Sequence, residues 1–147
     1  MPVTTEELIG TGANGNHSHC IMCGDLNQLS LRLKFVPDES GNVSASFQGH
    51  SLLQGYDGIL HGGVISALLD AAMTHCLFHR NIEAVTGQLF VRFLASVPYD
   101  ARVTLRARLV EATPPLYQLQ AELGDGCSVL ARADAKFMQR TQANGFG

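Results

Sequence analysis

The sequence predicts an α+β fold in which an antiparallel sheet of about six strands wraps around one long central helix. One observation is a single long apolar segment, residues 64–78, with apolar side chains over most of its circumference. This distribution is typical of a helix surrounded by other structure. The other observation is that most remaining segments alternate apolar and polar residues, as strands do when one sheet face is buried and the other is wet.

Six segments carry the strand pattern, two before the helix and four after it. Residues rich in Pro, Gly, Asn and Asp separate several of them, as expected for turns. We expect the four later strands to pair in sequence as a meander. The six segments are 29–35, 43–47, 86–94, 101–111, 116–123 and 128–138.

Length and composition predict one domain of 147 residues with a mild net charge of −3. We place a flexible N-terminal segment at 1–19, the domain at 20–138 and a C-terminal tail at 139–147. No basic run is present, which disfavours nucleic acid as a partner. No segment has enough unbroken apolar residues to span a bilayer, and the first residues lack a signal-peptide core. A cytoplasmic protein with no membrane partner is therefore expected.

A short cysteine motif stands apart from this pattern. Cys20-x-x-Cys23, preceded by His17 and His19, offers the ligand types that zinc prefers. A closed structural zinc site usually draws on two well-separated pairs, however, and the two other cysteines are single and distant. We assign no metal ligand and interpret the motif as a loop of packed thiols, with metal binding as the alternative.

The helix contains an unusual acid, Asp70. Ser66, Asp70 and Thr74 are spaced i, i+4, i+8, which places them in one polar row on an apolar helix. A carboxylate in such surroundings loses hydration unless it is paired or faces a wet cleft. Asp70 is thus either a structural residue that holds a neighbouring loop or a general base or nucleophile.

The start of the helix favours the catalytic reading. Gly62 and Gly63 are expected to present unpaired N–H groups at the positive end of the helix dipole, which suits an oxygen that gains negative charge. Eight residues of helix separate Gly62 from Asp70, a rise of about 12 Å. One reacting carbon cannot contact both within one chain, so we predict a two-fold dimer in which Gly62 of one subunit lies near Asp70 of the other.

At this point the sequence resembles a known family, the hotdog-fold acyl-CoA thioesterases, in the branch related to the phenylacetate-pathway thioesterase and human thioesterase superfamily members. The resemblance covers roughly residues 20–138. Its most specific part is the spacing between His61-Gly62-Gly63 and Asp70. The matching residues are Cys20-x-x-Cys23-Gly24, Leu31-Arg32-Leu33, Gly58-Ile59-Leu60-His61-Gly62-Gly63, Asp70, Thr86, Phe93-Leu94-x-x-Val97-Pro98 and Ala133-x-Ala135-x-Phe137.

The resemblance implies a role for each of four residues in catalysis. The amide of Gly62 would help to form an oxyanion hole, and Asp70 would be the nucleophile or the base that activates water. Thr86 matches a strand hydroxyl that positions the water or the acid. His61 would orient the loop or the thioester.

Three further residues are expected to bind the substrate: Gly63, Gln54 and Gly55. Relatives carry an Asn or Gln that polarises the thioester carbonyl six residues before the histidine. In this sequence that position is Gly55, with Gln54 one step away. Gln54 would replace the missing group if the loop is shifted.

The implied activity is that of an acyl-CoA thioesterase, a thiolester hydrolase that releases free acid and CoA at a site shared by two subunits. No cofactor is expected beyond the coenzyme A of the substrate. The resemblance is compatible with a homodimer or a homotetramer formed as a dimer of dimers. Two alternatives stay open: an acyl-thioester hydratase or dehydratase, and a non-catalytic acyl-CoA binding protein.

Overall fold

The computed structural model describes residues 17–140, which fall into two compact units, 17–34 and 35–140. The predicted N-terminal segment 1–19 and C-terminal tail 139–147 lie mostly outside the described residues. Within residues 17–140, no helix has both the length and the apolar character needed to cross a membrane.

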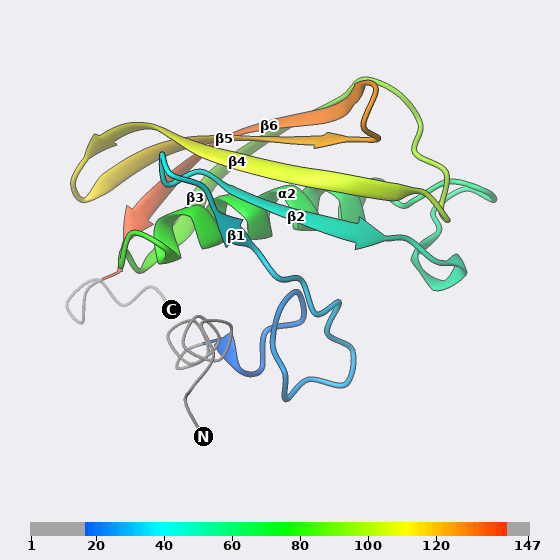
Figure 1. Ribbon diagram of the computed structural model, residues 1–147, viewed down its shortest axis with the longest axis horizontal. Helices are drawn as coiled ribbons and strands as arrows, with labels where there is room; N and C mark the ends of the chain where they lie inside the picture. Colours follow the sequence, from blue (N-terminus) through cyan, green and yellow to red (C-terminus); the bar gives the residue numbers. More distant parts are fainter. Residues whose placement is uncertain (1–16, 141–147) are drawn as a thin grey trace. The chain divides into compact units, whose positions relative to one another are not determined.

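The larger unit is a six-stranded antiparallel sheet that curves over the helix α2 (Figure 1). The strands follow the order β1-β2-β4-β5-β6-β3 across the sheet. The elements are β1 (Val36–Pro37), β2 (Val43–Gln48), a short 3-10 helix η1 (Ser51–Leu53), α2 (Gly62–Phe78), β3 (Ala84–Phe93), β4 (Arg102–Thr113), β5 (Leu116–Gly124) and β6 (Val129–Gln139). The predicted sheet wrapped around one long helix is confirmed.

The core lies between α2 and the sheet face that covers it. Alternate residues of β4 and β5 are buried, while the residues between them are mostly exposed or half-buried. Each fully buried Leu or Phe contributes about 2–3 kcal/mol through loss of water contact. The largest fully buried side chains are Phe137, Leu68, Leu69, Met73, Leu77, Leu105, Leu119, Leu123, Val97, Val103 and Cys76.

The position of β3 differs from the predicted meander. β4, β5 and β6 do pair in sequence, but β3 pairs with β6 at the far edge of the sheet, and β4 pairs with β2. Thr86 of β3 lies opposite Phe137 of β6. The meander expectation was wrong because α2 carries the chain across the sheet before β3 begins, and a periodic pattern carries no information on which strand is the neighbour.

The predicted strand at 29–35 is not formed. Only Val36 and Pro37 pair with β2. Arg32 has a φ of +54°, in the left-handed region, which interrupts an extended strand. The N–H groups of Leu31 and Leu33 donate to the carbonyls of Ile21 and Met22 (2.9 and 3.0 Å). This segment therefore closes the smaller unit and does not extend the sheet.

Candidate active site

The start of α2 is built by the side chain of His61. His61 is the N-cap residue, and its Nδ1 accepts a hydrogen bond from the N–H of Gly63 (2.8 Å). We expected both glycine N–H groups to be unpaired, and for Gly63 that was wrong because the imidazole folds back over the first turn. No hydrogen bond to the Gly62 N–H is found within residues 17–140. Gly62 therefore has an N–H that this helix start leaves for an external oxygen.

The loop before the helix holds His61 in place. The His61 N–H donates to the carbonyl of Leu53 (2.9 Å). Gly55 packs directly beside it, because a Cβ at residue 55 would lie 3.2 Å from the Cα of His61 and 3.3 Å from its ring. A larger residue at position 55 would press on the histidine. Gly55 thus supports the position of His61 and has no side chain to polarise a carbonyl.

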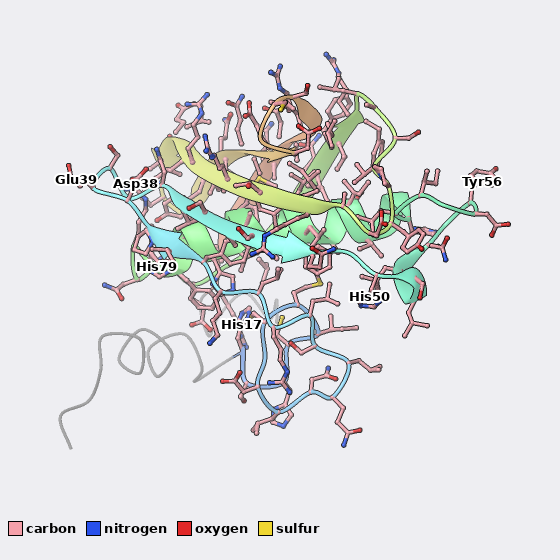
Figure 2. The ribbon with its side chains drawn as sticks, turned by 45° about the vertical axis from the view of Figure 1, so that its right-hand side comes forward. His17, Asp38, Glu39, His50, Tyr56 and His79 are labelled. Atoms are coloured by element: carbon pink, nitrogen blue, oxygen red, sulfur yellow. The ribbon has the colours of Figure 1, made fainter. Side chains whose placement is uncertain are left out.

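Gln54 is engaged within its own turn. Its Nε2 donates to the carbonyl of Ser51 and its Oε1 accepts from the N–H of Gly58, both at 2.8 Å. These bonds shape the loop that leads to its exposed tip at Tyr56, which points away from the sheet (Figure 2). Its expected role as the polarising group stays a prediction. It requires the second N–H of the Gln54 amide, which Ser51 does not use, to donate to the thioester carbonyl.

Asp70 differs from the two hydroxyl residues of its row. The hydroxyls of Ser66 and Thr74 donate back to the helix carbonyls of Gly62 and Asp70, both at 2.9 Å. The carboxylate of Asp70 instead reaches β3, where its Oδ1 accepts from the hydroxyl of Thr86 (2.5 Å). The structure thus brings together two residues, 16 positions apart, that were both predicted to be catalytic.

The surroundings of Asp70 act on its pKa in two directions. Burial raises the pKa of the carboxyl, and the hydrogen bond from Thr86 lowers it. Asp70 is only half-buried and Thr86 is exposed on β3. The carboxyl is therefore partly desolvated but not sealed from a ligand, as a general base or nucleophile requires.

Phe93 was assigned no role from the sequence beyond its place in the resemblance. Its ring would lie 3.5 Å from a Cβ at Gly62, so β3 reaches the start of α2 at its C-terminal end. Its side chain is 53% exposed. An exposed aromatic ring beside the Gly62 N–H provides an apolar wall for whatever binds there.

The candidate residues form two groups at two positions along α2. His61, Gly62, Gly63 and Gly55 gather at its start, whereas Asp70 and Thr86 meet eight residues further on. At 1.5 Å of rise per residue, the two groups are about 12 Å apart along the helix. One group can bind a negative oxygen and the other can accept a proton.

Comparison with known proteins accords with this geometry. Residues 57–116, which include all of these residues except Gly55, match the model of the family described as Thioesterase superfamily. A crystal structure described as a thioesterase superfamily protein superposes with a TM-score of 0.77 at 21% sequence identity, covering 83% of this chain and 61% of that one. The protein therefore has the hotdog fold, and the match to the thioesterase superfamily covers its residues 57–116. The resemblance drawn from the sequence is confirmed.

Two further structures share the fold. A Streptococcus mutans protein bound to acetyl CoA gives a TM-score of 0.68 at 20% identity, covering 74% of this chain and 88% of that one. The PaaI protein from the phenylacetic acid degradation operon of E. coli gives 0.70 at 15% identity, covering 76% and 81%. Among curated proteins, no sequence matches this chain.

Proposed function

We propose that this hotdog protein hydrolyses an acyl-CoA thioester to a free acid and CoA. The observation that carries the proposal is the contact between Asp70 and Thr86, which fixes a partly desolvated carboxylate at an accessible position. The match to the thioesterase superfamily over residues 57–116 supports a thioester as the bond that is cleaved. The structural neighbour bound to acetyl CoA supports coenzyme A as the carrier.

The chemistry uses the start and the middle of the helix differently. Asp70 acts either as the base that takes a proton from water or as the nucleophile that attacks the thioester carbon. The carbonyl oxygen becomes negative as the new C–O bond forms, and the Gly62 N–H donates to it. Collapse of this intermediate breaks the C–S bond, and the CoA sulfur leaves as a thiolate that takes up a proton. If Asp70 is the nucleophile, the acyl group is then bound to its carboxylate as an anhydride, and water hydrolyses this anhydride to the free acid and regenerates Asp70. No cofactor takes part.

The separation of the two groups argues for a site shared by two chains. The oxyanion donor and the base must each lie about 3 Å from the reacting atoms. On one helix, however, Gly62 and Asp70 are about 12 Å apart. Two antiparallel copies of α2 would bring Gly62 of one subunit near Asp70 of the other. A homodimer is therefore part of the proposal, and a dimer of dimers is compatible with it.

The edge of the sheet supports this assembly. Among residues 17–140, β3 is the last strand after β6 and no strand pairs with its outer side, so the backbone groups there can pair with another strand. Its apolar side chains are exposed, with Phe90 57% and Phe93 53% accessible. Pairing of two β3 strands would cover these side chains and bring the Asp70–Thr86 contact to the interface.

The direct test is release of free thiol from benzoyl-CoA and hexanoyl-CoA by the purified protein. We expect the unaltered chain to release CoA and Asp70→Ala to lose at least about a hundredfold in kcat, as removal of a general base does. Glu39→Ala is the control, since Glu39 is an exposed acid in the turn between β1 and β2 (Figure 2).

Each contrary outcome has a distinct meaning. If the unaltered protein releases no thiol across a broad acyl panel, hydrolysis is wrong. Tight binding of acyl-CoA without turnover would then identify a binding protein. Addition or removal of water across the acyl chain would identify a hydratase or dehydratase. If Asp70→Ala keeps the full rate, the carboxylate is structural.

A further inference from the structure

The outer face of the sheet, turned away from α2, carries most of the basic residues of the chain. Successive side chains of a strand point to opposite faces, so the residues between the buried ones lie on this outer face. Six of the ten basic residues are found there, although the net charge of the whole chain is −3. They are Arg92, Arg102, Arg106, Arg108, Arg132 and Lys136, and they outnumber the carboxylates of the same face, Glu111, Glu122 and Asp134. The outer face therefore attracts anions.

A groove of about 460 Å³ lies on this face, over β2, β4 and β5 and beside the turn that follows β1. Its volume falls within the range of small-molecule sites, about 300–1,000 Å³. Arg106 and Arg108 line the groove from β4, and Asn42 and Ser44 line it at the start of β2. All four side chains can donate hydrogen bonds, as the binding of an anion requires.

The two carboxylates that line the groove already have partners. The Oδ1 of Asp38 accepts two backbone N–H groups of its own turn, at 2.8 and 3.0 Å (Figure 2). Glu122 lies opposite Arg106 across β4 and β5, but its Oε1 is 3.5 Å from the Nε of Arg132 on β6. These contacts offset part of the negative charge, so the carboxylates repel an anion in the groove less strongly.

The two arginines of the groove differ in what holds them. Arg108 donates to the Oε1 of Gln120, whose Nε2 donates to the carboxylate of Asp134 (2.8 Å). This chain of hydrogen bonds orients the Arg108 guanidinium. The side chain of Arg106 is exposed, and in the part of the chain that the structure describes it has no hydrogen bond or ion pair. One arginine is therefore oriented in advance, and the other keeps all its N–H groups for a ligand.

We propose that this groove binds a diphosphate group through Arg106 and Arg108. The two residues are spaced i, i+2 on β4, so their side chains leave the strand about 7 Å apart on the same face. Two linked phosphates can each accept hydrogen bonds from one guanidinium over that span, because arginine binds phosphate through parallel N–H bonds. Thr86 points to the opposite face of the sheet, toward Asp70, so the groove is separate from the candidate active site.

Free nucleoside diphosphates and CoA both contain this group. Binding in the groove does not depend on the proposed hydrolysis, whereas assigning the diphosphate to CoA rests on it. The experiments therefore measure binding first and turnover second.

The first test is calorimetric titration of the full-length protein with inorganic pyrophosphate and with ADP. We expect one equivalent to bind per chain, with an affinity that falls as salt rises. Arg106→Gln should weaken the binding of both by at least about tenfold, since it removes charged hydrogen bonds. Arg106→Lys keeps the charge without the planar fork and should be intermediate. Arg102→Gln is the matched control and should bind as the unaltered chain does, because Arg102 lies on the same strand and face but outside the groove.

Two results would overturn the site. One is that the unaltered chain binds neither pyrophosphate nor ADP. The other is equal weakening in Arg102→Gln and Arg106→Gln, which would show attraction to the whole face and not to the groove. Both readouts need no turnover, so they hold even if the protein hydrolyses no thioester.

A kinetic comparison then distinguishes the two sources of the diphosphate. Benzoyl-CoA contains the group and benzoyl-pantetheine lacks it. If CoA supplies the diphosphate, Arg106→Gln should raise KM for benzoyl-CoA about as much as it weakens ADP binding, with kcat and the benzoyl-pantetheine reaction unchanged. If a free nucleotide supplies it, ADP binding is lost in this variant while KM for benzoyl-CoA stays the same.

Discussion

β5 and β3 belong to the same sheet but are buried very differently. Every second residue of β5 from Tyr117 to Leu123 is buried, because β4 and β6 flank the strand and α2 covers its face. In β3 none of the ten residues is buried, although the strand is just as apolar. The contrast comes from position, since β3 has a neighbour on one side only. Among the described residues, the outer side of the strand beside the candidate site therefore has no neighbouring strand.

A similar contrast holds along α2. Most residues after Asp70 are buried, whereas Gly62 at its start and Asp70 at its middle are half-buried. These two residues lie near Phe93 and Thr86, at opposite ends of β3. The exposed strand β3 and the candidate residues Gly62 and Asp70 therefore lie at the same edge of the sheet. If this edge is an interface that completes a catalytic site, changes to these residues should alter activity or assembly.

The largest effect is expected from Gly62→Pro. Proline fits the first position of a helix, and His61 already has the extended backbone (φ −63°, ψ 135°) that a residue before proline prefers. The change removes the N–H donor and should lower kcat by about a hundredfold to a thousandfold, with little effect on folding.

Gly62→Ala is the matched control for this variant. It keeps the N–H, and its Cβ would make an ordinary contact 3.5 Å from the ring of Phe93. We expect its kcat in the thiol-release assay to stay close to that of the unaltered chain. Equal rates for the Pro and Ala variants would remove the oxyanion role of Gly62.

A smaller effect is expected from placing a charge on the β3 edge. Leu89 lies opposite the buried Ala135 of β6 and is itself 36% exposed. Leu89→Lys should shift the protein from dimer to monomer in sedimentation experiments at micromolar concentration. Activity should fall in proportion to the dimer fraction, by about tenfold or more.

The opposite edge of the sheet provides the control. Val36 in β1 is 63% exposed, so Val36→Lys adds the same charge to the other border. This variant should keep both the dimer and the activity. If the two lysine variants behave alike, β3 is not the contact edge.

Thr86→Val should change the pH dependence more than the maximal rate. The hydroxyl of Thr86 lowers the pKa of Asp70, against the effect of burial, so its loss leaves that pKa higher. The acidic limb of the kcat/KM profile, where Asp70 must be ionised, should then move to higher pH. Thr86→Ser keeps the hydroxyl and should keep the profile. An unmoved limb in the Val variant would show that Asp70 does not govern it.

The smallest effect is expected on stability. Burial holds the pKa of Asp70 above its ordinary value, so the folded chain binds that proton more tightly than the unfolded chain. The free energy of unfolding therefore falls as pH rises through this interval. Asp70→Asn should raise the unfolding midpoint at neutral pH, and the difference should vanish at pH below about 4. A midpoint lowered at neutral pH would mark Asp70 as a stabilising structural residue.

Local patterns in the sequence were sufficient for most elements of the fold. The helix and five strands were predictable from residue periodicity, because burial of one face requires apolar residues at regular spacing along the sequence. The strand predicted at 29–35 failed on the backbone of Arg32, whose left-handed φ leaves no mark in an alternating pattern. The place of β3 beside β6 depends on pairing between distant segments, which periodicity does not record.

The candidate site was predictable in part. Asp70 was found because it is a lone acid on an apolar helix, and the contact with Thr86 then joined it to a residue known only from the resemblance. The capping of Gly63 by His61 depends on a side-chain rotamer. The closed hydrogen bonds of Gln54 depend on the shape of its turn. Neither feature can be obtained from residue identities alone.

Complementation between two inactive variants tests the shared site most directly. Gly62→Pro and Asp70→Asn chains are purified separately, mixed, unfolded and refolded together so that they pair at random. If each site takes Gly62 from one chain and Asp70 from the other, half of the dimers are mixed and each mixed dimer has one intact site. We then expect thiol release to recover to about a quarter of the unaltered rate. Mixtures no more active than the separate variants, although mixed dimers have formed, would contradict the account.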